Sequence, residues 1–180
     1  MTFEEKTLSR EVVYEGRILN LIKEEVMTVS GQPAIREMIE HNGGVGLVAI
    51  TSDNKIIMVK QFRKALERDM LEIPAGKLEK GEDPLEAAAR ELEEETGYKA
   101  ENIEFMTRYY PSVGYIRECL YLYLCTGLSK GEAHPDDDEA IDTYMYTMEE
   151  LEKLIAEGNL QDGKSMAALY AAKLRLCSAK

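Results

Sequence analysis

Residues 76–98 read GKLEKGEDPLEAAARELEEETGY, and they carry the strongest local signals in the chain. They predict a helix over residues 84–96. Asp83 can cap its first turn, and Pro84 suits the first helical position because its missing N–H would have no helical partner there. Gly97 is the expected C-terminal stop, since glycine adopts the left-handed conformation at little cost.

This helix has an apolar side and an acidic side. At about 100° per residue, one stripe forms the expected core face: Leu85, Ala88, Ala89, Leu92 and Thr96. Glu91, Glu94 and Glu95 fall together on one flank, and Glu93 falls on the opposite flank. Crowded carboxylates destabilise a helix by a few tenths of a kcal/mol per pair. Magnesium, a hard cation that binds carboxylate oxygens, would remove this penalty.

An acidic run on a helix is usually a solvated face, and three glutamates alone would favour that interpretation. The surrounding pattern favours a site instead: Gly76, five residues, Glu82, seven residues, Arg90-Glu91-Leu92, one residue, Glu94-Glu95, one residue, Gly97 and Tyr98. Every specified position matches the Nudix box. The chain therefore resembles the Nudix hydrolases and, more narrowly, their ADP-ribose pyrophosphatase branch.

The resemblance extends beyond the box and covers about residues 8–175. It includes residues 59–63, VKQFR, and residues 71–79, LEIPAGKLE. It implies an α+β protein with the Nudix fold, an α/β/α sandwich with a mixed β-sheet, preceded by a small N-terminal β-region. We expect residues 1–41 to form that region, for dimerisation and substrate contacts, and residues 42–180 to form the Nudix hydrolase domain.

Apolar patterning along the rest of the chain agrees with an α+β class. Expected strands cover residues 12–14, 18–29, 35–39, 45–50, 55–59, 103–109, 119–124 and 141–146, and expected helices cover residues 148–157 and 164–177. The residues 52–54, SDN, are a hairpin signal between two of these strands. Residues 127–138 are polar, contain glycine and proline, and are typical of a long loop.

The resemblance also implies which residues bind metal. The ligands would be the Ala75 carbonyl and the carboxylates of Glu91 and Glu95, while Glu94 would bind a further ion or support the others. Arg90 would orient the carboxylates and Glu82 would stabilise the loop. The expected cofactor is Mg²⁺, with Mn²⁺ as the alternative.

Catalysis and substrate binding involve residues outside the box. By resemblance, the general base comes from a loop far down the chain, where Glu139 is the first candidate and Asp137 the second. A solvated acidic loop without a role is the alternative. Arg63 is a candidate diphosphate clamp, because a guanidinium matches phosphate with two donors; the alternative is a surface arginine. The other expected substrate contacts are Arg36, Glu37, Glu72 and Glu118.

The resemblance implies magnesium-dependent hydrolysis of ADP-ribose to AMP and ribose 5-phosphate. Alternative substrates are another nucleoside diphosphate sugar, such as GDP-mannose, or a dinucleotide. A non-catalytic sensor that binds ADP-ribose is a further alternative. One departure from the pattern of this branch leaves the choice among these substrates open. Residues 109–114 read YYPSVG, whereas the branch usually has Ser-Pro-Gly in this segment.

The resemblance implies a small nucleoside diphosphate derivative as the partner, and the composition bears on the other classes of partner. The chain has 34 acidic and 22 basic residues and a net charge of −12, which disfavours nucleic-acid binding. No apolar run is long enough to span a membrane, and residues 1–10 lack the apolar core of a signal peptide. Three cysteines without CxxC spacing indicate reduced core thiols and a cytoplasmic location. A homodimer is expected from the resemblance alone.

Overall fold

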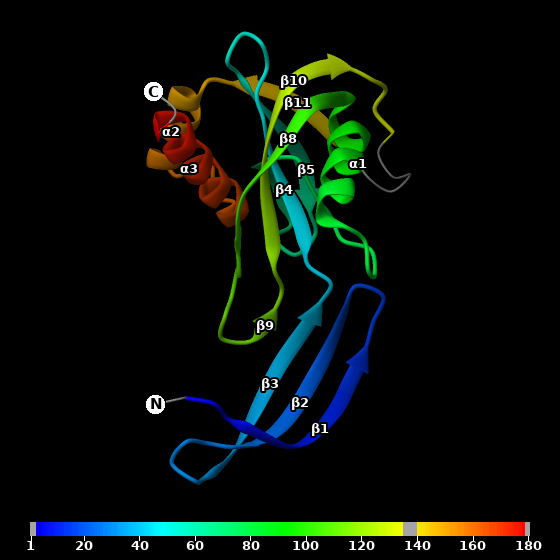
Figure 1. Cartoon of the computed structure of the whole chain (residues 1–180), viewed down its shortest axis with the longest axis vertical. Coiled ribbons are helices and arrows are strands. Elements are labelled where there is room, and N and C mark those ends of the chain that lie inside the picture. Colours follow the sequence, from blue (N-terminus) through cyan, green and yellow to red (C-terminus); the bar gives the residue numbers. More distant parts are fainter. Residues whose placement is uncertain (1–2, 135–139, 179–180) are drawn as a thin grey trace. The chain divides into compact units, whose positions relative to one another are not determined.

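The computed structural model describes residues 3–134 and 140–178, which form two compact units (Figure 1). The first unit comprises Met1–Gly43 and Tyr110–Cys119, and the second comprises Gly44–Tyr109 and Leu120–Lys180. The short segment 110–119 therefore belongs with the N-terminal strands, although it lies far from them in the sequence. Each unit is described separately below.

The first unit is a four-stranded sheet with the order β1-β2-β3-β9. Its strands are β1 (Lys6–Glu15), β2 (Leu19–Met27), β3 (Pro33–His41) and β9 (Ile116–Arg117). The first three are antiparallel, and the turn between β2 and β3 contains Gly31 at φ 79°. β9 pairs parallel with β3 through Ile39 and Ile116. A two-residue strand has no periodic pattern, so the sequence did not predict it.

The second unit contains two sheets. One has the order β7-β4-β10-β8, formed by β7 (Ala75–Lys77), β4 (Gly44–Ala49), β10 (Leu120–Lys130) and β8 (Tyr98–Tyr109). The other has the order β11-β5-β6, formed by β11 (Ile141–Tyr146), β5 (Ile56–Arg63) and β6 (Arg68–Glu72). β4 and β10 are parallel and the other pairs are antiparallel, so the sheet is mixed as expected.

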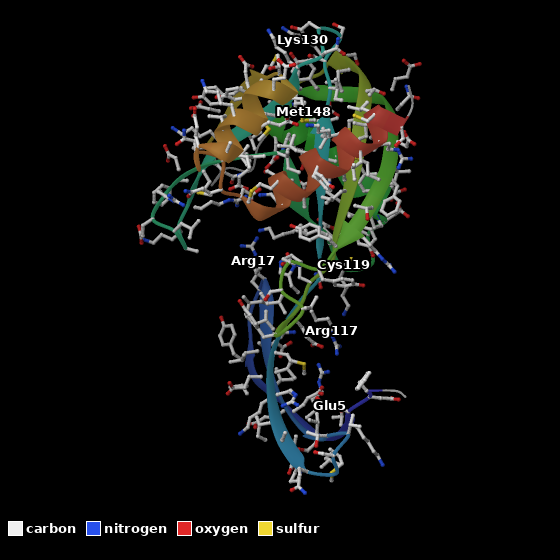
Figure 2. All side chains as sticks on the ribbon, turned by 90° about the vertical axis from the view of Figure 1, so that its left-hand side faces the viewer. Glu5, Arg17, Arg117, Cys119, Lys130 and Met148 are labelled. Carbon is white, nitrogen blue, oxygen red and sulfur yellow. The ribbon has the colours of Figure 1, made fainter. Side chains whose placement is uncertain are left out.

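Helices lie on both sides of the β4-β10-β8 sheet (Figure 1). α1 (Pro84–Thr96) covers one face, and α2 (Met148–Ala156) and α3 (Gly163–Ser178) cover the other. Figure 2 shows the side with α2 and α3 toward the viewer, with Met148 labelled at the start of α2. Side chains alternate along β4: Val48 packs in the core with α3, and Leu47 packs in the core with α1. The expected α/β/α sandwich is confirmed.

Two local predictions need correction. Residues 45–50 and 55–59 are joined by a tight turn, in which the Thr51 N–H donates to the Lys55 carbonyl at 2.8 Å. The two strands then separate into different sheets, because each pairs more extensively with a strand distant in sequence. The predicted loop over residues 127–138 begins too early, since residues 127–130 continue β10 and pair with the start of β8.

The cysteines and the helices add two observations. Of the three expected core thiols only Cys125 is buried, whereas Cys119 is half-buried and Cys177 is exposed, so the prediction was wrong for Cys177. None of the helices in the described ranges combines the length and apolar character needed to cross a membrane.

Candidate active site

α1 begins and ends as its sequence predicts. The Asp83 carboxylate accepts the N–H groups of Leu85 at 2.8 Å and Glu86 at 3.4 Å, and Pro84 opens the helix. At the other end Gly97 is left-handed, with φ 68°, and its N–H donates to the Glu93 carbonyl at 2.8 Å. These local contacts fix the bounds of α1 without help from the rest of the fold.

The buried side of α1 differs from the predicted stripe. Leu85 and Ala89 are exposed, whereas Ala87 is fully buried and Glu95 is only 6% exposed. The helix packs through three residues, Ala87, Ala88 and Leu92, against a core that includes Val45, Leu47 and Ile57. This packing rotates the core face toward the acidic flank. Glu95 therefore lies at the edge of the core and not on a solvated face.

Arg90 lies among the carboxylates of the acidic flank. Its guanidinium donates to Glu91 and Glu94, each at 2.8 Å, and to Glu82 at 3.1 Å. Burial acts to lower the pKa of Arg90, but the hydrogen bond to Glu82, the charge of Glu91 and the hydrogen bonds to Glu94 and Glu91 raise it above its ordinary value. The hydrogen bond from Arg90, with one from the Glu79 N–H, lowers the pKa of Glu82. Arg90 therefore stays charged and joins the loop carboxylate to two glutamates of α1.

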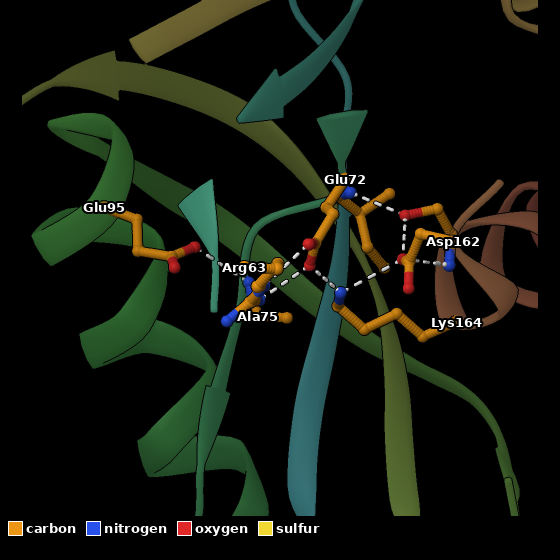
Figure 3. Close-up of polar contacts among 8 residues, drawn as sticks. Arg63, Glu72, Ala75, Glu95, Asp162 and Lys164 are labelled. Atoms are coloured by element: carbon orange, nitrogen blue, oxygen red, sulfur yellow. Dashed lines mark hydrogen bonds and ion pairs between the residues drawn. The ribbon is translucent and has the colours of Figure 1, made fainter. Parts of the chain in front are cut away.

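Two further glutamate contacts connect α1 to the start of β7. A Cβ at Gly76 would stand 1.8 Å from Glu91 Cδ, so the Glu91 carboxylate occupies the space that only glycine leaves open there. Glu95 Oε2 accepts the Ala75 N–H at 2.8 Å (Figure 3). The residue pair Ala75-Gly76 thus lies directly beneath two carboxylates of α1.

The chemistry of this donor set fits a divalent cation. Glu91, Glu94 and Glu95 share one flank, and the backbone of Ala75 lies beside them, so hard oxygen donors are concentrated in one place. Across residues 3–134 and 140–178, no three acidic, histidine or cysteine side chains already converge as metal ligands. Arg90 binds Glu91 and Glu94, and Ala75 binds Glu95. Binding a cation would exchange some of these hydrogen bonds for metal ligands.

Arg63 and Glu72 form a second polar cluster at the ends of β5 and β6. Arg63 Nε and Nη2 donate to the two Glu72 oxygens at 2.7 and 2.6 Å, and Lys164 also contacts Glu72 (Figure 3). Burial acts to raise the pKa of Glu72, but the hydrogen bond from Arg63 and the charge of Lys164 bring it below the ordinary value. Glu72 is therefore ionised, and it holds Arg63 in one orientation.

The sequence predicts a helix over residues 164–177, but it did not indicate that the first turn of α3 completes this cluster. Lys164 Nζ lies 3.0 Å from Asp162 Oδ2, and Ser165 Oγ accepts the Ile73 N–H at 2.8 Å. An aspartate three residues before Ser165 is a signal for a helix start. Nothing local indicates that Lys164 meets Glu72, because 92 positions separate them.

The remaining predicted site residues belong to the first unit or fall outside the described residues. Arg36 and Glu37 are on β3 in the first unit, where Arg36 Nε donates to Glu5 at 2.9 Å and Glu37 is exposed. Glu118, in the same unit, lies 3.4 Å from His41 Nδ1. The two candidate bases, Asp137 and Glu139, fall outside the described residues.

Residues 131–134 lie beside the end of α1. The Gly131 N–H donates to the Gly97 carbonyl at 2.7 Å, and the His134 N–H donates to the Glu94 carbonyl at 3.0 Å. Residues 131–134 are therefore anchored to the last turn of α1, which carries Glu94 and Glu95.

Comparison with known proteins gives matches over nearly the whole chain. A family model described as the NUDIX domain matches residues 40–169. A methanol dehydrogenase activator of Bacillus methanolicus is 45% identical over 96% of this chain and 95% of its own length. An ADP-ribose pyrophosphatase of Bacillus subtilis is 41% identical over 97% of this chain and 95% of its own length.

A solved structure supports the fold independently of close sequence similarity. The crystal structure of an ADP compounds hydrolase superposes with a TM-score of 0.87, covering 98% of this chain and 96% of that chain, at 20% identity. At this identity the likeness establishes the arrangement of strands and helices, which the strand pairing and the two core layers also show.

Proposed function

This chain belongs to the Nudix family and is a Nudix hydrolase, and from this premise we propose that it hydrolyses the diphosphate of ADP-ribose to AMP and ribose 5-phosphate. The observation that carries the proposal is the acidic flank of α1, where Glu91, Glu94 and Glu95 meet Arg90 and the backbone of Ala75. The similarity to an ADP-ribose pyrophosphatase supports the choice of substrate.

The proposed cofactor is Mg²⁺, with Mn²⁺ as the alternative. Glu91, Glu94, Glu95 and the Ala75 carbonyl would hold it. When bound, a divalent cation neutralises charge on the phosphoryl oxygens of a diphosphate. The chain itself favours such a cation, because Glu91 and Glu94 both pair with the same guanidinium, that of Arg90, so that acidic side chains are concentrated on this flank.

The protein's own groups would position the substrate and accept a proton. Arg63, held by Glu72, would present its remaining N–H groups to the diphosphate. Glu139 would take the proton of the attacking water, with Asp137 as the second candidate; the anchoring of residues 131–134 on α1 supports a base from this segment. The other predicted substrate contacts are Arg36, Glu37, Glu72 and Glu118.

The decisive experiment measures AMP release from ADP-ribose with MgCl₂, beside GDP-mannose, other nucleoside diphosphate sugars and dinucleotide polyphosphates. An EDTA control and the variant Glu95→Gln define the background. Metal-dependent turnover that prefers ADP-ribose supports the proposal. Preference for another compound retains the mechanism and changes the substrate, whereas binding of ADP-ribose without any turnover indicates a sensor.

A second candidate function is the activation of a methanol dehydrogenase. It is favoured by the 45% identity to a methanol dehydrogenase activator along nearly the whole of both chains. The test measures the activity of the methanol dehydrogenase of Bacillus methanolicus after addition of the wild-type protein or of the Glu95→Gln variant, which should lack hydrolase activity. Stimulation by the wild type alone would connect activation to hydrolysis, and no stimulation by either protein would reject it.

We also propose that the protein is a cytoplasmic homodimer. All ten residues of β1 are exposed in the single chain, including Leu8, Val12, Val13 and Tyr14. The exposed apolar side chains of this strand form a surface that a second copy could cover. Light scattering on the purified protein measures its mass directly, and a monomer at micromolar concentration would reject the dimer.

A further inference from the structure

The start of α3 reaches back to residues that lie 92 positions earlier in the chain. Glu72 is 2% exposed, and its carboxylate receives N–H donors from Arg63 on one side and Lys164 on another (Figure 3). A buried carboxylate needs such partners, because removing it from water without them is costly. Glu72 is too enclosed to contact a substrate with much of its surface. The two hydrogen bonds that it accepts from Arg63 indicate instead that it orients the Arg63 guanidinium.

The orientation of Arg63 follows from the way Glu72 binds it. Glu72 uses Nε and Nη2, which is one edge of the planar guanidinium. Within the described ranges, Nη1 has no hydrogen-bond partner, and the side chain remains 40% exposed. The second edge of the guanidinium, formed by Nη1 and Nη2, is therefore free to bind a phosphate with two donors.

Lys164 holds Glu72 in place from the opposite side. Its side chain is 14% exposed and contacts both Glu72 and Asp162, with Nζ 3.0 Å from Asp162 Oδ2. Without this cation, two carboxylates would face each other in a poorly solvated place and would repel. Asp162 itself is fixed, because it accepts the Ser165 N–H at 2.9 Å and caps the first turn of α3.

The same turn also holds the backbone that leads to Ala75. Ser165 is fully buried, and its Oγ accepts the Ile73 N–H at 2.8 Å. Two residues later, the Ala75 N–H donates to Glu95. The segment 72–75 is thus fixed by α3 at its start and by α1 at its end.

We propose that Lys164 is a positioning residue, which fixes Glu72 and thereby orients Arg63 toward the diphosphate of the substrate. This inference rests on the proposed function for the identity of the ligand. It assigns a positioning role in the site to the first turn of α3, which lies outside the Nudix box. Lys164 acts through another residue and has no direct contact with substrate in this proposal.

A double-mutant cycle tests whether Lys164 acts through Arg63. The dissociation constant of the non-hydrolysable analogue α,β-methylene ADP-ribose is measured for the wild type, Arg63→Ala, Lys164→Met and the double variant. When Arg63 is present, we expect Lys164→Met to weaken binding of the analogue about tenfold. In the Arg63→Ala background it should have almost no further effect, because the effects of substitutions at residues that act through one another are not additive. Full additivity would overturn the proposal.

Steady-state kinetics and a matched lysine provide the controls. Lys164→Met should raise KM for ADP-ribose more than it lowers kcat, and Lys164→Arg, which keeps the cation, should recover much of the loss. Lys173→Met removes an exposed lysine of the same helix that pairs with Glu152 at the surface, and it should leave KM unchanged. If Lys164→Met does not yield folded protein, Lys164→Gln enters the same cycle.

A measurement without ligand separates this inference from the proposed function. The Nε–H signal of Arg63 in a ¹⁵N-correlated NMR spectrum is assigned by its absence from Arg63→Ala. In the wild type it should be protected from exchange by Glu72, and in Lys164→Met it should broaden or exchange faster. An unchanged signal overturns the inference whatever the activity. If the signal changes but no nucleotide is hydrolysed or bound, the proposed function fails and the positioning role stands.

Discussion

The carboxylate of Glu91 lies directly against the backbone of Gly76, so that a Cβ at residue 76 would stand 1.8 Å from Glu91 Cδ and 1.9 Å from Oε1. Glycine is required here by the space that the glutamate occupies, not by an unusual backbone angle, because φ of Gly76 is not positive. One relationship therefore explains two features of the motif pattern: a glycine at its start and a glutamate fifteen positions later.

Gly76→Ala should reduce activity much more than stability. The added methyl group displaces the end of a flexible side chain, which can swing away at small energetic cost, so the free energy of unfolding should change by no more than about 1 kcal/mol. The displaced Glu91 could no longer serve the site, and kcat should fall about a hundredfold. Thermal unfolding and AMP release measure the two effects. Wild-type turnover would remove Glu91 from the metal site.

Glu95→Gln and Glu93→Gln form a matched pair on the same helix. Glutamine at 95 can still accept the Ala75 N–H, so the fold should persist, while loss of the charge should lower metal-dependent turnover by orders of magnitude. Glu93 pairs with Lys99 near the surface, at 3.0 Å, and its replacement should change stability by less than about 0.5 kcal/mol and leave turnover intact. The measurement is kcat against Mg²⁺ concentration for both variants. Equal losses of turnover in the two variants would mean that the charge of residue 95 has no special role in metal-dependent hydrolysis.

Glu139→Gln should lower kcat while leaving KM for ADP-ribose nearly unchanged, because a general base acts on the proton of the water and not on substrate binding. Glu139 lies outside the described residues, so this prediction comes from the sequence and from the anchoring of residues 131–134 on α1. Asp137→Asn is tested in parallel. If only the second variant loses turnover, the base is Asp137.

Glu72 should make the stability of the fold depend on pH. Burial opposes its charge, but Arg63 and Lys164 place its pKa in the folded protein below the unfolded value of about 4.3. The charged form therefore stabilises the folded state above that pH, and this stabilisation is lost as pH falls through the lower, folded-state pKa.

Glu72→Gln provides the measurement of that effect. At pH 7 it should reduce the free energy of unfolding by about 2 kcal/mol, since it removes the buried carboxylate that Arg63 binds with two donors and that Lys164 also contacts. Urea unfolding at pH values from 7 down to 3 should show the difference between the variant and the wild type shrinking as Glu72 is protonated. A constant difference over this range would mean that Glu72 is not the titrating group.

Much of the candidate site could be predicted because its determinants are local. The bounds of α1 depend on Asp83, Pro84 and Gly97, which act on the turns beside them. The gathering of Glu91, Glu94 and Glu95 on one flank depends only on helical spacing. The resemblance to the Nudix box, which rests on those same residues, is matched by the NUDIX domain over residues 40–169.

The tertiary structure decided what depends on contacts between distant segments. Leu85 and Ala89 have the periodicity of core residues but are exposed, because packing of Ala87 and Leu92 against the sheet sets the rotation of α1. Strands joined by a tight turn after β4 separate into two sheets, and Lys164 meets Glu72 across 92 positions. Helical spacing and capping act within one turn of chain, whereas burial and ion pairing depend on which surfaces the fold brings together.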